Sequence, residues 1–83
     1  MNQYGRLTGF LLNQPSTEVR VSFAEMEDKA TIGIRLPIVA KTSVLWWENV
    51  STRDARQSRA WMDAGWEVTG TDLSGQLITF QRR

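Results

Sequence analysis

The sequence contains neither cysteine nor histidine. Disulfides, thiol nucleophiles, Cys/His zinc sites, Ser-His-Asp triads and haem ligation by histidine are therefore excluded. The nine acidic residues are scattered along the chain, which argues against a metal site built from oxygen ligands. We expect no metal and no cofactor, assign no catalytic residue and predict that the protein is not an enzyme.

Long apolar runs are also missing. No segment approaches the roughly 18 apolar residues of a membrane span, and the N-terminal segment lacks the charged-then-apolar layout of a signal peptide. We therefore expect a soluble, cytoplasmic protein without a membrane partner. The 83 residues predict one domain over residues 1–83. So short a chain buries little surface and is marginally stable. We therefore expect self-association to stabilise it by extending the core across an interface.

The net charge of +1 is too small to drive DNA binding by bulk charge. Eight of the ten basic residues are arginine, which makes planar, bidentate contacts with phosphate or carboxylate groups. The candidate phosphate-binding residues are Arg53, Arg56, Arg59, Arg82 and Arg83. The alternative is that they are solvated or paired with nearby acids, as Arg59 would be with Asp63 at an i, i+4 spacing.

Apolar spacing predicts the elements of the first half. Residues that recur at steps of three and four predict a short helix before Pro15: Tyr4, Leu7, Phe10 and Leu11. Apolar and polar residues alternate strictly over residues 18–23, which predicts a strand with one solvent-exposed face. Ser22 and Glu25 have the spacing of a capping box, which predicts a second helix to about Ala30, with Met26 and Ala30 facing inward.

The segment 42–47 is rich in β-branched and aromatic residues, and this predicts an extended strand after a helical turn that Pro37 opens. Adjacent residues of a strand face opposite sides. We therefore expect only one of Trp46 and Trp47 to enter the core. The other would be exposed, covered by the arginine-bearing helix or buried in a partner.

The second half predicts a helix and a hairpin. The helix runs from about Thr52 to Ala64, is capped by Ser51 or Thr52 and ends at Gly65 in a left-handed cap. Its inward face would carry Gln57, Ala60, Trp61 and Ala64. Alternating segments at 66–71 and 76–81 flank a turn at 72–75. The predicted class is α+β: a small, mostly antiparallel sheet of three or four strands, helices packed on one face, and a C-terminal β-hairpin.

The pattern L-P…A…W-W-x-N…Q-x-x-A-W-x-x-A-G-W, between Leu36 and Trp66, resembles that of a family of small bacterial domains of unknown function. The similarity covers most of the chain, from about Tyr4 to Arg82. Val39 replaces the family's serine, and Met26 replaces its isoleucine. The resemblance implies no activity. It implies a domain that stands alone or beside nuclease domains, and a small orphan protein of the kind carried by mobile elements such as integron cassettes.

All four tryptophans lie between residues 46 and 66, and each buries roughly 150–250 Å². We expect that the core of a single small domain cannot bury all four tryptophan side chains. The candidate interaction surface comprises Trp46, Trp47, Asn49 and Gln57. The alternative for Gln57 is a buried hydrogen bond to the backbone of residues 46–49, because an unpaired amide there would cost about 1–3 kcal/mol.

These observations lead to three hypotheses. The first is a non-enzymatic binding or assembly module that forms a homo-oligomer, or binds another protein, through its aromatic-rich surface. The second is a module that binds DNA or RNA through its arginine-bearing helix, with a tryptophan stacking on bases. The third and weakest is a hydrolase. It would require two carboxylates to converge in a cleft, either Glu48 with Asp54 or Glu67 with Asp72.

Overall fold

The computed structural model describes residues 3–50 and 56–83. The elements follow in the order α1 (Gly5–Leu12), β1 (Glu18–Ser22), α2 (Phe23–Glu27), α3 (Ile38–Thr42), the 3₁₀-helix η1 (Val44–Trp47), α4 (Arg56–Met62), β2 (Trp66–Asp72) and β3 (Leu77–Arg82). The expected cap of the main helix, at Ser51 or Thr52, lies outside the described residues.

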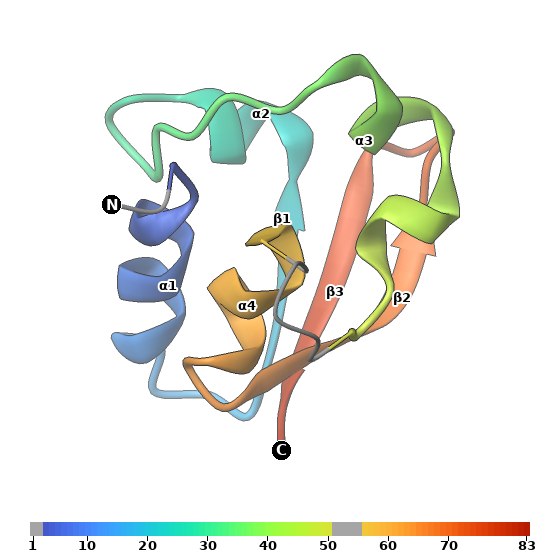
Figure 1. Cartoon of the computed structure of the whole chain (residues 1–83). Helices are drawn as coiled ribbons and strands as arrows, with labels where there is room; N and C mark the ends of the chain where they lie inside the picture. Colours follow the sequence, from blue (N-terminus) through green and yellow to red (C-terminus); the bar gives the residue numbers. More distant parts are fainter. Residues whose placement is uncertain (1–2, 51–55) are drawn as a thin grey trace.

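The three strands form one antiparallel sheet in the order β1-β3-β2, with the helices on one face (Figure 1). β2 and β3 are the predicted C-terminal hairpin, and Val68 lies opposite Phe80. A bulge between Val68 and Gly70 shifts the register of β2. The predicted α+β class is confirmed, with three strands.

The capping box that starts α2 is present. Ser22 Oγ accepts from the Glu25 N–H at 3.1 Å, and the Glu25 carboxylate accepts from the Ser22 N–H at 3.0 Å. The helix ends at Glu27, however, and not near Ala30. The Asp28 carboxylate accepts from the Ala30 N–H at 3.0 Å and closes a turn instead. Met26 is buried as expected, but Ala30 is exposed, so its predicted inward position is wrong.

The prediction of a strand over residues 42–47 is wrong. Pro37 precedes the first residue of α3, and η1 follows at once, started by the Ser43 hydroxyl, which accepts from the Leu45 N–H at 3.3 Å. Successive residues of a 3₁₀-helix are separated by about 120° instead of the 180° of a strand. Trp46 and Trp47 can therefore both turn towards the core.

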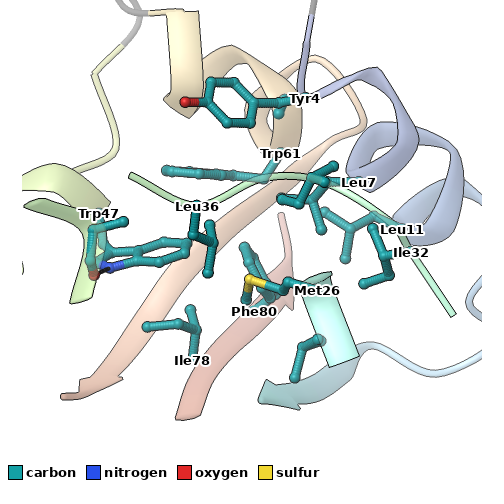
Figure 2. Packing of buried hydrophobic residues seen from close by; sticks show 14 of the residues in the cluster. Tyr4, Leu7, Leu11, Met26, Ile32, Leu36, Trp47, Trp61, Ile78 and Phe80 are labelled. Atoms are coloured by element: carbon teal, nitrogen blue, oxygen red, sulfur yellow. Dashed lines mark hydrogen bonds between the residues drawn. The ribbon is translucent and has the colours of Figure 1, made fainter. Parts of the chain in front are cut away.

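The core lies between the helices and the sheet (Figure 2). Its largest side chains are Trp47, Trp61 and Trp66, each exposed by 2% or less. Trp47 lies between two parallel rings, with centroid distances of 5.9 Å to Phe23 and 5.7 Å to Trp61. Its indole N–H donates to the Ala40 carbonyl at 2.7 Å, so the buried ring leaves no polar atom unpaired.

Trp46 is half-buried and packs against this cluster. Its ring lies 4.7 Å from that of Trp47 and 5.7 Å from that of Tyr4, edge to face in both cases. One chain thus covers three indoles completely and the fourth in part. The core hides more indole than the sequence analysis expected, because the turn of η1 brings both neighbouring rings inward, and only Trp46 stays partly accessible.

Gly65 has the predicted left-handed conformation, with φ of +84°, but α4 ends at Met62 and not at Ala64, so Gly65 closes the turn that follows the helix. We expect Gly65→Ala to lower the free energy of unfolding by about 1 kcal/mol, because a Cβ is disfavoured at this φ. The matched control is Gly9→Ala inside α1, where an added Cβ meets no atom within 4 Å. There, alanine should stabilise the chain by about 0.5–1 kcal/mol. Urea unfolding measures both, and equal effects would contradict this account.

Candidate functional site

Asn49 is the polar residue that joins the most parts of the fold. Its Oδ1 accepts from the Trp61 indole N–H at 2.9 Å and from the Val68 N–H at 2.8 Å, and its Nδ2 donates to the Val68 carbonyl at 2.9 Å. One carboxamide therefore ties the segment after η1 to α4 and to the outer edge of β2. These bonds use the amide edge that a ligand would need.

A second tie between this segment and α4 comes from Ser58, which is buried and donates its hydroxyl hydrogen to the Val50 carbonyl. The sequence analysis assigned this role to Gln57, which the structure places half-buried beside Ser58. Thr8 adds a bond from α1 to α4, donating to the Ala60 carbonyl at 2.7 Å. Small hydroxyl side chains fit close helix contacts, and no spacing rule in the sequence marks them.

The candidate phosphate-binding arginines do not form one open cluster among the described residues. Arg59 pairs with Asp63 at 3.5 Å, as the i, i+4 spacing predicts. Arg82 lies 5.0 Å from the centre of the Trp66 ring and donates to a backbone carbonyl at 2.6 Å. Arg83 lies 3.5 Å from another carbonyl. Arg56 is exposed and makes contacts of its own, and Arg53 lies outside the described residues.

The exposed apolar side chains lie elsewhere than predicted. Four of them belong to two consecutive helices that contact each other: Ile38 (81% exposed), Val39 (47%), Val44 (54%) and Leu45 (67%). We call these four the α3–η1 surface; of the two helices that carry it, η1 packs against β2 (Figure 1). Trp47 is buried and so cannot belong to an interaction surface. The sequence analysis missed this surface because a strand was expected there.

In the described part of the chain, the candidate carboxylates are engaged in local structure or stand apart. Asp72 closes the hairpin turn, accepting from the Gly75 N–H at 2.9 Å and the Ser74 hydroxyl at 3.1 Å. Glu48 is exposed, and its suggested partner Asp54 lies outside the described residues. Within residues 3–50 and 56–83, no group of three or more acidic side chains is placed to hold a metal ion. Burial raises the pKa of Tyr4 above its ordinary value of 10.0, so this phenol stays neutral at physiological pH.

Over residues 4–83 the chain matches a family model described as a domain of unknown function, DUF7662. Because the match spans nearly the whole sequence, the chain belongs to this family. Searches of the curated proteins and of the solved structures gave no match. In the described part of the chain, none of the helices is long and apolar enough to cross a membrane. The bacterial and mobile-element setting that the resemblance implies stays a prediction.

Replacing Asn49 by leucine tests whether its amide is structural. The variant leaves the Trp61 indole N–H and the Val68 backbone without these partners, so we expect a loss of about 1–3 kcal/mol in the free energy of unfolding. Gln57→Leu, a half-buried amide one turn before Trp61, is the matched control and should change stability by less than about 0.5 kcal/mol. Chemical denaturation followed by tryptophan fluorescence measures both. A larger loss for Gln57→Leu would restore it as the residue that anchors the loop.

Proposed function

We propose that the protein is a non-enzymatic assembly module that self-associates through the α3–η1 surface. The observation that carries the proposal is the exposure of four large aliphatic side chains between residues 38 and 45. Their neighbours on the same two helices, Ala40 and Trp47, fill the core. These aliphatic side chains lie outside the core cluster, and half or more of the surface of most of them is available to a partner.

The only charge on this segment is already neutralised. Lys41 Nζ lies 2.9 Å from a carboxylate oxygen of Glu27, and the two side chains are 41% and 36% exposed. The same carboxylate accepts from the Leu36 N–H at 3.4 Å, which holds α3 against α2. A partner that covers the α3–η1 surface thus meets a paired cation, whose desolvation costs less than that of an unpaired one.

A second copy of the chain is the occupant that the surface fits best. In a two-fold contact each copy presents the same aliphatic patch, so apolar area meets apolar area. The net charge of +1 opposes such a contact only slightly. Fully burying one Ile, Leu or Val side chain contributes about 1.5–3 kcal/mol, while association costs at least about 4 kcal/mol. We therefore expect weak self-association, in the micromolar to millimolar range.

The double substitution Ile38→Lys and Leu45→Lys should abolish this contact. We expect the dissociation constant to rise at least about a hundredfold, since the two lysines together replace burial worth at least about 3 kcal/mol. Stability should change by less than about 0.5 kcal/mol per site, because both side chains are exposed in the single chain. Sedimentation velocity over a concentration series measures association, and tryptophan fluorescence verifies folding.

The matched control is Leu12→Lys, which removes a side chain that is 63% exposed at the end of α1, away from the α3–η1 surface. It should leave self-association unchanged. Equal effects of Leu12→Lys and of the double variant would contradict the assignment of the surface. If the wild-type chain instead bound short DNA or RNA with an affinity that falls steeply as salt rises, the nucleic-acid hypothesis would replace this one.

A further inference from the structure

The backbone of β1 has a definite hydrogen-bonding direction. Just before β1, the Thr17 carbonyl accepts from the Arg82 N–H at 2.8 Å. Just after it, the Phe23 N–H donates to the Gln76 carbonyl at 3.0 Å. These two residue pairs, Thr17 with Arg82 and Phe23 with Gln76, continue the β1–β3 register, which has no shift along β1. In antiparallel strands the hydrogen-bonded residues recur at every second position. The odd-numbered residues of β1 therefore face β3.

The even-numbered residues Glu18, Arg20 and Ser22 direct their N–H and C=O groups away from β3, along the outer edge of the sheet. The N–H of Ser22 confirms this direction, since it donates to the Glu25 carboxylate of the capping box. Within residues 3–50 and 56–83, no residue outside β1 bonds the backbone N–H and C=O of Glu18 or Arg20. This short edge is open.

The opposite edge of the sheet is capped at the middle of β2, at Val68. The Asn49 carboxamide bonds both the N–H and the C=O of Val68, as a neighbouring strand would. Among the described residues, no side chain bonds the backbone of Glu18 or Arg20 in this way, and η1 packs against β2 at the far edge (Figure 1). Because unpaired strand edges are templates for another strand, β1 is a site at which the sheet can grow.

We propose that β1 pairs antiparallel with the β1 of a second copy, about a two-fold axis at Val19. Glu18 then lies opposite the partner's Arg20, and Arg20 opposite the partner's Glu18. Both pairs are of the hydrogen-bonded type, so each exchanges two backbone hydrogen bonds. The result is a continuous sheet of twice the width. This interface is distinct from the α3–η1 surface and does not depend on it.

The order of charges selects this register. A two-fold axis at Arg20 would oppose arginine to arginine, and an axis at Glu18 would oppose glutamate to glutamate, which is destabilising in cross-strand pairs. Only the axis at Val19 opposes unlike charges. Glu18 and Arg20 are both exposed, and neither makes an ion pair with any other residue in the described part of the chain. Their charges are therefore available to a partner strand.

Charge reversal tests the register. Arg20→Glu places glutamate opposite glutamate twice, and we expect the dissociation constant of this contact to rise about tenfold. The double variant Glu18→Arg/Arg20→Glu restores unlike pairs in the same register and should recover the wild-type value. Sedimentation velocity in low salt, carried out in the Ile38→Lys/Leu45→Lys background, isolates this interface from the α3–η1 surface. Failure of the double variant to recover association would overturn the proposal.

A direct readout uses the wild-type chain. In a mixture of ¹³C-labelled and unlabelled protein, the proposed pairing brings the Val19 Hα of the two copies together, because residues of non-hydrogen-bonded pairs approach most closely. We expect an intermolecular Hα–Hα NOE at Val19 and slower exchange of the Glu18 and Arg20 amide hydrogens as concentration rises. If the NOE is missing at concentrations where the chain is dimeric, β1 pairing is wrong, while association through the α3–η1 surface stands.

Discussion

The burial of the Trp47 indole is the constraint on which the rest of the fold depends. Its ring stacks between Phe23 and Trp61, and its N–H is satisfied by the carbonyl of Ala40. To reach this position, the chain must wrap around the end of the sheet as two short helices in succession. The Asn49 carboxamide then fixes the returning segment to α4 and to β2. In a chain without disulfides, these polar contacts hold the aromatic core in place.

The same constraint explains why aliphatic side chains lie outside. α3 has five residues and η1 has four, and each buries only one of them, Ala40 and Trp47. Apart from Trp46, which packs against the core, most of the remaining positions are exposed, and four of them are aliphatic. The resulting surface follows from how the aromatic residues pack, and not from an excess of indole. The sheet adds an independent feature, since Asn49 caps its β2 edge at Val68, whereas the backbone groups of Glu18 and Arg20 on its β1 edge have no partner among the described residues.

Much of the fold was predictable, because local signals agree with the tertiary structure there. The three- and four-residue steps in α1, the capping box at Ser22, Gly65 and the hairpin alternation are each decided by neighbouring residues. The segment from 37 to 50 was not predictable in this way, because β-branched residues suggested a strand where packing of Trp47 imposes a 3₁₀-helix. The same error affected the candidate interaction surface, because the prediction that Trp46 or Trp47 is exposed assumed the alternating side chains of a strand. The roles of Ser58 and Asn49 depend on contacts between distant segments, which spacing does not reveal.

The central claim is that the packing of the indoles leaves an aliphatic surface through which the chain binds its own copy. Sedimentation equilibrium of the wild-type protein, from micromolar concentration to about one millimolar, tests it most directly, because weak association of the kind expected from the buried area falls in this range. The account predicts a weight-average mass that rises reversibly from that of one chain to at least that of two. A mass that stays at one chain across the whole range would contradict it.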